Sequence, residues 1–457
     1  MSRPIGEPIC ALITPPGHAA VTLIRLSGYG ALGIVAKYFK NRRKLLQAPT
    51  HTAVFGVFHD HLGKPLDQVL CTVFRAPKSY TGEDSVEISC HGNPRIAARI
   101  LENLLLEARL AEPGEFTLRA LLNGKLDLMQ AEAVNDLIGA AGSKAESAAL
   151  MQVQGLLSNR LRALLDGIND ARLRCELAID FADQDLPPLD EKDLQQRVSK
   201  LLKEACELLG EGRLGRLIRE GIKVCLAGAP NAGKSSLFNA FLKQNRAIVT
   251  PHPGTTRDYL EESVSFHGYK LVLIDTAGLR ESENDIEREG ISRSRALMRE
   301  ADLVLYLLPA DEAVEPEQLT PELSAKTLWL ASKWDLISAD SENEKSERDG
   351  CTPELGIPVS TLEPKGLEAL QDAILQRFEL PTGDLERPLV TNARHLAALE
   401  RAMQALTRAQ QSLEHQAGYE FTAFDLAAAA GDIGEILGIS ADGDLLNDIF
   451  ANFCIGK

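Results

Sequence analysis

Residues 228–236 read GAPNAGKSS and match the phosphate-binding pattern G-x-x-x-x-G-K-[ST] directly after an apolar run. The glycines allow backbone amides to turn toward phosphate oxygens, Lys234 reaches the β and γ oxygens of a nucleotide, and Ser235 offers its hydroxyl to magnesium. Such a string occurs by chance in about one or two per cent of chains of this length. We therefore predict a P-loop nucleotide-binding domain around it.

Apolar runs that alternate with helical segments surround this loop. The runs are KVCLAGA, KLVLIDTA, ADLVLYLLPA and KTLWLASKWD. Short buried runs joined by helices are typical of a mainly parallel sheet with crossover helices. The pattern predicts an α/β architecture for this part of the chain.

Two further motifs supply groups for the phosphates and for magnesium. PGTTRD at 253–258 contains Thr256, a switch threonine for magnesium. DTAG at 275–278 contains Asp275 for the magnesium shell and Gly278, whose amide faces the γ-phosphate. Their order along the chain indicates a Ras-like GTPase domain.

The motif SKWD at 332–335 stands where the base-reading motif [NT]-K-x-D is expected. Asp335 can accept hydrogen bonds from the guanine N1–H and 2-amino group, which adenine lacks, and the stem of Lys333 can pack over the base. Ser332 replaces the usual Asn, and the last loop reads STL at 360–362 rather than S-A-K. We expect specificity for GTP to survive through Asp335, with a weaker affinity.

The residues expected around GTP come from the phosphate loop, the loop 250–256, DTAG and the two base-reading loops. Lys234 is also counted as catalytic, because it reaches the oxygens of the bond that breaks. The full set is Asn231, Ala232, Gly233, Lys234, Ser235, Ser236, Thr250, Pro251, His252, Pro253, Gly254, Thr255, Thr256, Asp275, Thr276, Ala277, Gly278, Ser332, Lys333, Trp334, Asp335, Ser360, Thr361 and Leu362.

The position after DTAG, where many GTPases carry a glutamine that orients the attacking water, is Leu279. Its side chain forms no hydrogen bond, so another group must position the water. A monovalent cation held beside Asn231, with carbonyls of TPHPGTT at 250–256, would occupy the place of an arginine finger. A carboxylate of the acidic run ESENDIERE would then orient the water, although such a run is more often a solvated surface.

Three patterns of expected secondary structure follow one another along the chain. The start mixes short strand-like runs (AVTLIRLSG, DQVLCTVF, DSVEISC) with a helical stretch from Arg95 to Arg109, and helical patterns flank the α/β part on both sides. We expect an α+β N-terminal domain at 1–120, a discontinuous helical domain at 121–215 and 380–457, and a G domain at 216–379 inserted into it.

Composition narrows the class of protein. The 457 residues carry a net charge of −16, so a polyanionic partner requires a local positive patch or another subunit. No secretory signal and no apolar run that could span a membrane is present, and we expect a cytoplasmic protein. The eight cysteines lack zinc-ligand spacing and are read as reduced thiols.

The chain ends ANFCIGK, with a cysteine four residues from the end. A lipid attachment box is disfavoured, because Gly456 is not aliphatic, Lys457 is not a usual final residue and no basic stretch precedes Cys454. A buried small side chain and a thiol delivered to an active site both remain open.

The GTPase motifs together with SYTGEDSVEISCHG, PGEFTLRALLNGKLDLMQAEAVNDLI, TNARH and the terminal FCIGK closely resemble the MnmE (TrmE) family of tRNA wobble-uridine modification GTPases. The resemblance runs from PPG…LIRLSG to the last residue. It implies a homodimer, tRNA as substrate and a heterotetramer with MnmG, an FAD protein. It also implies potassium, magnesium and 5-formyltetrahydrofolate or methylenetetrahydrofolate as cofactors.

The family's functional positions can be carried over residue by residue. Potassium falls on Asn231, Thr250, His252 and Thr255, and magnesium on Ser235 and Thr256. The catalytic glutamate falls on Glu287, and the tail contributes Cys454 as a candidate catalytic thiol. The folate contacts fall on Arg25, Glu87, Lys125 and Lys457. HAA at 18–20 and HGNP at 91–94 replace glycine-rich family patterns, which would narrow a ligand pocket.

Two other classes share some of these motifs. A regulatory GTPase of ribosome assembly would have the same G motifs, but not the N-terminal domain or the tail, and the chain lacks a basic RNA-binding stretch. A P-loop metabolic kinase is disfavoured by Asp335. The leading hypothesis is a dimeric, potassium-activated GTPase that adds a carboxymethylaminomethyl-type group at carbon 5 of the wobble uridine.

Overall fold

The computed structural model divides into two compact units, each with its own apolar core. The first contains Met1–Asn135, Gln152–Leu194 and Arg408–Lys457, and the second contains Asp136–Met151 and Gln195–Thr407. No helix in the described part of the chain is long and apolar enough to cross a membrane. The structure describes residues 6–180, 190–244, 260–275, 287–310, 319–338, 356–362, 366–439, 443–451 and 453–457.

The N-terminal part of the first unit is a six-stranded sheet in the order β3-β4-β5-β2-β1-β6. Neighbouring strands are antiparallel except for the β1–β6 pair. The predicted strands AVTLIRLSG, DQVLCTVF and DSVEISC are confirmed as β2, β4 and β5. The strands are β1 (Ile9–Leu12), β2 (Val21–Ser27), β3 (Thr52–His59), β4 (Pro65–Phe74), β5 (Ser85–His91) and β6 (Arg109–Leu110).

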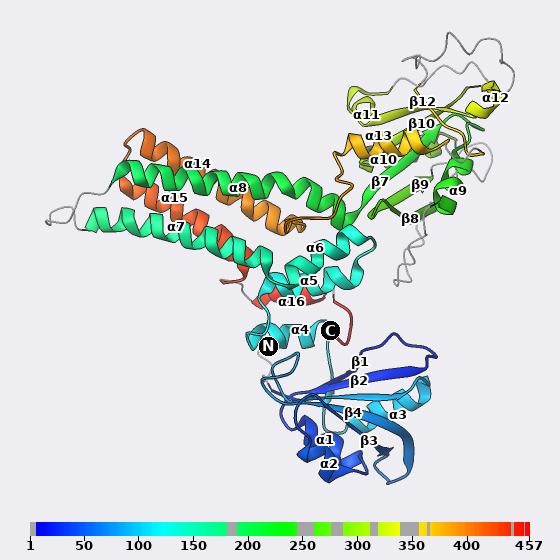
Figure 1. Cartoon of the computed structure of the whole chain (residues 1–457), viewed down its shortest axis with the longest axis vertical. Helices are drawn as coiled ribbons and strands as arrows, with labels where there is room; N and C mark the ends of the chain where they lie inside the picture. The colour runs from blue at the N-terminus through cyan, green and yellow to red at the C-terminus, as the bar shows by residue number, and fades with distance from the viewer. Residues whose placement is uncertain are drawn as a thin grey trace. The chain divides into compact units, whose positions relative to one another are not determined.

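Helices α1 (Ala31–Tyr38) and α3 (Pro94–Leu104) pack with α2 (Arg42–Gln47) on one face of this sheet (Figure 1). Because side chains alternate along a strand, Ile24, Leu26 and Ile88 enter that core, while Arg25 and Glu87 lie on the opposite face. This alternation places two predicted folate contacts opposite each other.

The predicted helix from Arg95 to Arg109 is wrong at its C-terminal end. α3 ends at Leu104, and Arg109 begins β6, where its amide donates to the carbonyl of Pro8 at 3.1 Å. Pairing with β1 gives the backbone of Arg109 partners that a longer helix would not supply, so tertiary context decides against helix here.

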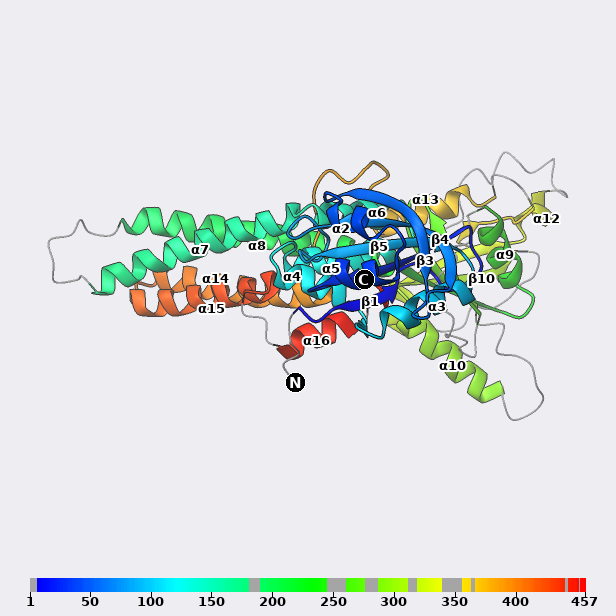
Figure 2. The same cartoon turned by 90° about the horizontal axis from the view of Figure 1, so that it is seen from below.

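The helices of the first unit pack along apolar stripes. α7 (Leu156–Asp180) and α15 (Tyr419–Leu437) run side by side (Figures 1 and 2). Leu157, Leu161 and Leu164 recur at spacings of three and four on α7, which gives one buried face. The unit also contains α4 (Glu115–Leu122), α16 (Gly443–Ala451) and most of α5 (Leu128–Gly139).

The second unit contains the predicted α/β domain. Its sheet has the order β12-β11-β10-β7-β9-β8, parallel throughout except that β8 runs antiparallel to β9, so the expectation of a mainly parallel sheet is confirmed. The strands are β7 (Ile222–Gly228), β8 (Leu260–Phe266), β9 (Tyr269–Asp275), β10 (Leu303–Pro309), β11 (Thr327–Ser332) and β12 (Ile357–Pro358).

Both faces of this sheet are covered, as a parallel sheet requires. Leu237 and Phe241 of α9 (Lys234–Gln244) and Leu370 of α13 (Glu368–Arg377) pack on one face. Met298 of α10 (Glu287–Glu300) and Leu323 of α11 (Pro321–Ala325) pack on the other. The short helix α12 (Trp334–Ser338) follows β11 directly.

Helical segments that flank this domain in sequence belong to the same unit. In α6 (Ser143–Val153), Ala148 is part of the core of the sheet, and the amide of Lys144 donates to the carbonyl of Gly268 at 3.0 Å. The long helices α8 (Glu191–Glu220) and α14 (Ala393–Glu414) are shared between the two units. The α/β domain is therefore anchored by side chains and backbone outside its own sheet.

Gly215 allows α8 to approach the segment that leaves the α/β domain. A Cβ at Gly215 would lie 2.0 Å from the carbonyl oxygen of Val390, whereas a Cβ at Gly210 on the same helix would meet nothing within 4 Å. Backbone atoms cannot move aside cheaply, so only glycine fits at Gly215.

We expect Gly215→Ala to destabilise the protein by about 1–3 kcal/mol, because the added methyl forces the two segments apart. Gly210→Ala is the matched control and should stabilise by about 0.5–1 kcal/mol, since alanine is the better helix former. Thermal unfolding midpoints of the two variants measure both effects. Equal shifts in the same direction would contradict the close approach.

Candidate functional site

The phosphate loop connects β7 to α9, at the carboxyl end of a central strand of the sheet. Three of its residues have left-handed backbone conformations, with φ of 132° at Gly228, 60° at Asn231 and 88° at Gly233. A Cβ at Gly228 would also lie 2.3 Å from the carbonyl oxygen of Leu307. The glycines thus let the loop turn tightly over the strand ends, which aims backbone amides at an anion.

The charged and hydroxyl groups of the loop lie where phosphate and magnesium chemistry needs them. Lys234 is buried, and its Nζ donates to the carbonyls of Gly228 at 2.9 Å and Ala229 at 2.7 Å. The Ser235 Oγ donates to the Asp275 Oδ2 at 3.5 Å, because β7 and β9 are parallel neighbours that end at the same edge. A hydroxyl and a carboxylate oxygen are ligands that magnesium prefers.

The base-reading segments are tied to the phosphate loop and to each other. The Ser332 hydroxyl donates to the carbonyl of Ala232 at 2.7 Å and also contacts that of Leu308 at 3.1 Å. The Ser360 hydroxyl donates to the Asp335 Oδ1 at 2.7 Å, which fixes the carboxylate expected to read guanine. Serine at the first motif position therefore still reaches the phosphate loop backbone.

Several predicted residues lie outside the described residues. They include the expected switch threonine, the loop expected to hold potassium and the rest of DTAG. Glu287 is the first residue of α10. The residues outside are Thr250, Pro251, His252, Pro253, Gly254, Thr255, Thr256, Thr276, Ala277 and Gly278.

A second constellation lies in the first unit, on the sheet face opposite the N-terminal core. Arg25 donates through Nε at 3.0 Å and through Nη2 at 2.8 Å to the same Oε1 of Glu87. Its guanidinium carbon lies 5.2 Å from the ring centroid of Tyr80 and 5.4 Å from that of Phe116. Paired charges beside two aromatic rings suit a flat, polar ligand with anionic groups.

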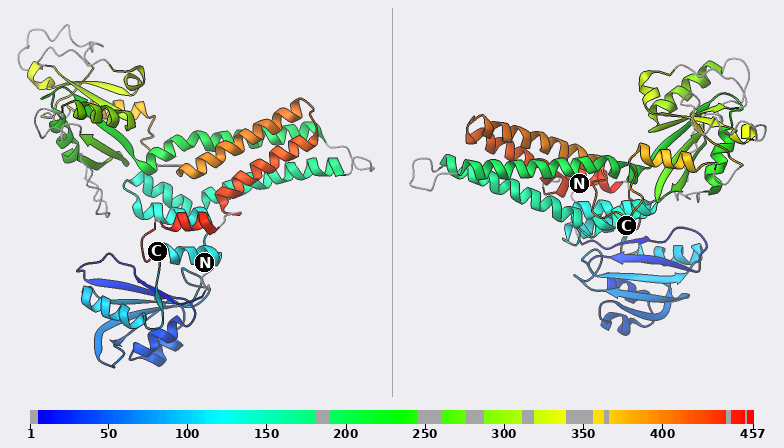
Figure 3. Two further views of the ribbon diagram at one scale, coloured as in Figure 1. Left: turned by 180° about the vertical axis from the view of Figure 1, so that it is seen from behind. Right: turned by 45° about the horizontal axis from the view of Figure 1, so that its top comes forward.

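The C-terminal tail returns to this site (Figure 3). The amide of Gly114 donates to the carbonyl of Cys454 at 3.4 Å, and that of Phe116 donates to the carbonyl of Lys457 at 3.2 Å. Gly456 has φ 97°, and a Cβ there would lie 2.7 Å from the carbonyl oxygen of Leu12. The tail is thus held by its backbone against the N-terminal sheet.

The predicted folate contacts differ in how closely the structure groups them. Lys457 is half-buried near Arg25, and its pKa is lowered, first by burial and then by the charge of Arg25. The Cys454 side chain is exposed. Lys125 instead donates to the carbonyl of Pro77 at 3.1 Å, in the segment that carries Tyr80.

Buried charges that no motif predicted support this region. Glu115, at the start of α4, accepts from Arg109 Nη1 at 2.7 Å and from Arg119 Nη2 at 2.9 Å. Arg119 also contacts Glu83, which accepts from the hydroxyl of Ser27 at 2.9 Å. Glu115 and Arg119 are four residues apart on α4, but Glu83 and Ser27 come from distant parts of the chain, so no motif marks the group as a whole.

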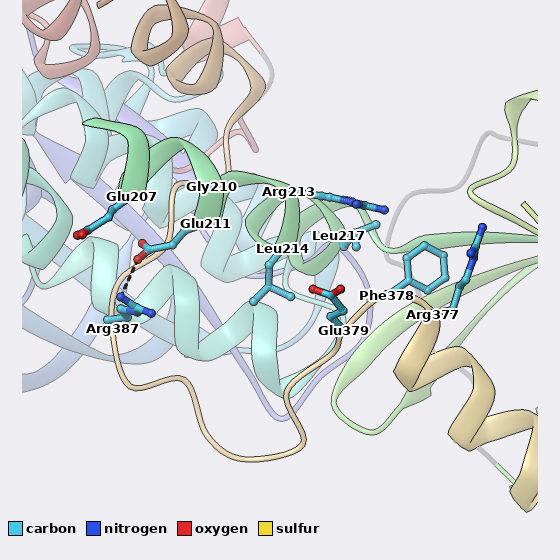
Figure 4. A pocket seen from close by; sticks show the side chains of 10 residues that line it. All are labelled: Glu207, Gly210, Glu211, Arg213, Leu214, Leu217, Arg377, Phe378, Glu379 and Arg387. Carbon is cyan, nitrogen blue, oxygen red and sulfur yellow. Dashed lines mark ion pairs between the residues drawn. The ribbon is translucent and has the colours of Figure 1, made fainter. Parts of the chain in front are cut away.

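A hollow in the second unit was not predicted either. It encloses about 370 Å³ between α8 and the segment that follows α13 (Figure 4). Its charged lining includes Arg213 and Glu379, and Glu211 and Arg387 form an ion pair at 2.9 Å. The hollow lies where the chain enters and leaves the α/β domain.

The fold and the phosphate loop define a P-loop GTPase with an additional N-terminal domain and helical segments. A family model described as MnmE helical domain matches residues 128–454, and one described as GTP-binding protein TrmE N-terminus matches residues 8–125. The chain belongs to the MnmE (TrmE) family of tRNA modification GTPases.

Relatives of the chain match it over its full length. A tRNA modification GTPase MnmE from Aquifex aeolicus is 42% identical over 99% of this chain and 100% of its own length. One from Moorella thermoacetica is 41% identical over the same shares. Among solved structures, the G domain of the T. maritima FeoB iron transporter is 29% identical over 34% of this chain and 97% of its own, with a TM-score of 0.23.

Glu115 makes the stability of the N-terminal domain sensitive to acid. Burial alone would raise the pKa of its carboxyl, but Arg109, the amide of Glu112 and Arg119 together lower that pKa from 4.5 to about 2. A depressed pKa contributes stability that is present above about pH 4.5 and is lost as the pH falls toward 2. A shift of this size corresponds to about 3.4 kcal/mol, and solvent screening of this partly exposed pair reduces the contribution to about 2–3 kcal/mol.

We expect Glu115→Gln to lower the free energy of unfolding at pH 7 by about 2–3 kcal/mol and to change it little at pH 2, because the neutral amide loses the charge contribution. Glu102→Gln, at an exposed position of α3, is the control and should behave as wild type. Denaturant titrations at both pH values measure the difference. An equal loss at both would argue for packing rather than charge.

Proposed function

We propose that this chain is a potassium-activated GTPase that acts with MnmG, an FAD protein, to add a carboxymethylaminomethyl-type group at carbon 5 of the wobble uridine of tRNA. The observation that carries the proposal is the C-terminal tail, whose Lys457 lies near Arg25 and Glu87 in the N-terminal domain. A GTPase that acts only as a switch has no need for such a second site.

Hydrolysis is assigned to groups around the phosphate loop. Lys234 and the Ser235–Asp275 pair support binding of the phosphates and of magnesium, which Thr256 would complete. Potassium beside Asn231, with Thr250, His252 and Thr255, would supply positive charge next to the reacting phosphate, as an arginine finger does. Leu279 cannot form the hydrogen bond that positions the attacking water. Glu287 orients the attacking water in this proposal, since a carboxylate accepts its hydrogen bonds.

The second site is assigned to a tetrahydrofolate, either 5-formyl or methylene. The guanidinium of Arg25 and the ammonium of Lys457 would meet its carboxylates, Glu87 would accept from its pterin donors, and Lys125 would act from the neighbouring loop. The folate would supply a one-carbon unit. Cys454 is the candidate thiol of the reaction, because its side chain is exposed next to Lys457 in the docked tail.

Assembly connects the two sites. The N-terminal domain at 1–120 would form the homodimer and bind folate, and the helical domain at 121–215 and 380–457 would carry the inserted G domain at 216–379. Binding of GTP and potassium would bring two G domains together, and two MnmG subunits would complete a heterotetramer that acts on tRNA in the cytoplasm. Closure of a dimer explains how a G domain without the water-positioning glutamine can turn over.

The alternative is a regulatory GTPase that binds a ribosome-assembly intermediate and modifies nothing. It would use the same phosphate loop. The side-chain pair of Arg25 and Glu87 at 2.8 Å, with the tail beside it, favours the modification enzyme, because a switch requires no ligand site there.

We expect Glu287→Ala to reduce the rate of potassium-dependent GTP hydrolysis at least 100-fold while leaving the affinity for GTP within a few-fold, since general-base or water-positioning groups contribute about 10²–10⁴. Glu300→Ala, at the other end of α10, is the matched control and should keep the wild-type rate. Single-turnover hydrolysis and nucleotide titration measure the two quantities. Weaker GTP binding with normal turnover of bound nucleotide would remove Glu287 from this role.

Nucleoside analysis of tRNA tests the modification itself. Mass spectrometry of tRNA from a deletion strain should show wobble uridines without the carbon 5 group, and wild-type protein should restore it. Cys454→Ser should not restore it although its GTPase rate stays normal, whereas Cys206→Ser, at another exposed cysteine, should restore it fully. Unchanged wobble uridines in the deletion strain would end the modification proposal.

A further inference from the structure

One stretch of this acidic chain contains no acidic residue. Residues 8–59 hold neither Asp nor Glu, although the chain as a whole carries 65 acids in 457 residues. At that average density a stretch of this length would hold about seven. The same stretch contains Arg25, Lys37 and Lys40 and the run of Arg42, Arg43 and Lys44, so it is strongly positive in a protein of net charge −16.

The fold gathers most of these cations on one exposed surface of the N-terminal domain. Lys37 near the end of α1 and Lys40 just after it line a hollow of about 410 Å³ together with His59 and His61 at the β3–β4 turn. Two residues after Lys40, α2 begins at Arg42, and its cations are exposed. We call Lys37, Lys40, Arg42, Arg43, Lys44, His59, His61 and Lys64 the basic face.

Backbone contacts hold this face rigidly against the sheet. The amide of Lys40 donates to the carbonyl of Val57 at 3.0 Å, and the side chain of Asn41 donates to that of Phe55 at 2.9 Å. Leu45, on the inner side of α2, is fully buried in the core. The cations between Asn41 and Leu45 therefore project from an anchored helix rather than from a loose tail.

The cations of the basic face are largely uncompensated within the protein. Within the described residues, the side chains of Lys40, Arg42, Arg43 and Lys44 have no hydrogen bond or ion pair, and Lys37 pairs only with Glu107. Asp60, the acid that lines the hollow, accepts from the amides of Leu62 and Lys64 and from Arg99. Its charge is already engaged by other donors.

An uncompensated cluster of cations on an acidic protein creates a local positive potential. Like charges at this density repel each other, and a partner with closely spaced negative charges relieves that repulsion and releases its own counterions. Phosphates of a nucleic acid backbone have this spacing, whereas the overall charge of −16 repels them elsewhere. The basic face is thus a place where a polyanion gains free energy from contact.

We propose that the basic face binds the phosphate backbone of the tRNA substrate. The identity of the RNA rests on the proposed function, but the binding chemistry does not. Contacts with phosphates position a nucleic acid without reading its sequence, so the face would orient tRNA rather than select it. An acidic protein surface is the other partner that such a face fits, and it is kept as an outcome of the test.

The test is a triple variant of the full-length protein, Arg42→Gln/Arg43→Gln/Lys44→Gln, which removes three positive charges from exposed positions. The matched control, Lys192→Gln/Lys200→Gln/Lys203→Gln, removes three exposed positive charges from α8. Because both variants have the same net charge, a difference in RNA affinity between them shows that the position of the lost charges matters. Binding of an unmodified tRNA transcript and of an unrelated RNA hairpin is followed by fluorescence anisotropy between about 50 and 200 mM salt.

We expect the α2 variant to bind both RNAs at least tenfold more weakly at low salt. The slope of log K against log salt should become less negative by about two to three, because each lost phosphate contact removes about 0.7–0.9 from that slope. The control should stay within about twofold of wild type. Both variants should keep the wild-type GTP hydrolysis rate in the absence of RNA and the wild-type unfolding midpoint.

Three results would overturn the proposal. The first is wild-type protein that shows no salt-dependent RNA binding. The second is an equal loss of RNA affinity in the two variants. The third is an α2 variant that keeps RNA binding and loses only dimerisation or association with an acidic protein. These readouts are separate from nucleoside analysis. If nucleoside analysis disproves the proposed modification, RNA binding by the basic face can still be measured. If the basic face does not bind RNA, the outcome of nucleoside analysis is not affected.

Discussion

The hydrogen bonds between the C-terminal tail and the first amides of α4 constrain the arrangement of the N-terminal site. The first amides of a helix have no partner within the helix, and Gly114 offers no side chain as a cap. The carbonyls of Cys454 and Lys457 fill that place, through the amides of Gly114 and Phe116. The tail thus completes a helix that is more than 300 residues away in sequence, and this brings Lys457 to Arg25.

The nucleotide site depends on a different constraint, the shared edge of a parallel sheet. Carboxyl ends of parallel strands lie together, and ligands bind where the strand order reverses. β7 lies between β10 and β9, so the phosphate loop after β7 meets Asp275 at the end of β9. Ser332 at the end of β11 reaches Ala232 in the same loop. Groups from three strands converge because of topology rather than sequence proximity.

Features that depend on local sequence patterns were predicted correctly, whereas features that depend on contacts between distant segments were not. The apolar runs and the phosphate loop have local patterns, and the strands and the mainly parallel sheet follow from them. The end of α3 was predicted wrongly, because the pairing of Arg109 with β1 depends on a contact across a hundred residues. The bond from Ser332 to Ala232 and the ion pair of Arg119 with Glu83 have no local signature, since each joins groups that only the fold brings together.

Electrostatics gives the N-terminal site a preference for one kind of ligand. Arg25 is paired with Glu87, but Lys457 adds a second cation beside it, and burial and the charge of Arg25 lower the pKa of the Lys457 ammonium. A second cation near Arg25 in a half-buried site costs free energy, and an anion bound there would offset that cost. Because the tail carries Lys457 into place through backbone bonds, this cost is incurred whenever the tail is docked. An anionic ligand at this site would therefore stabilise the docked tail, which also carries the exposed Cys454.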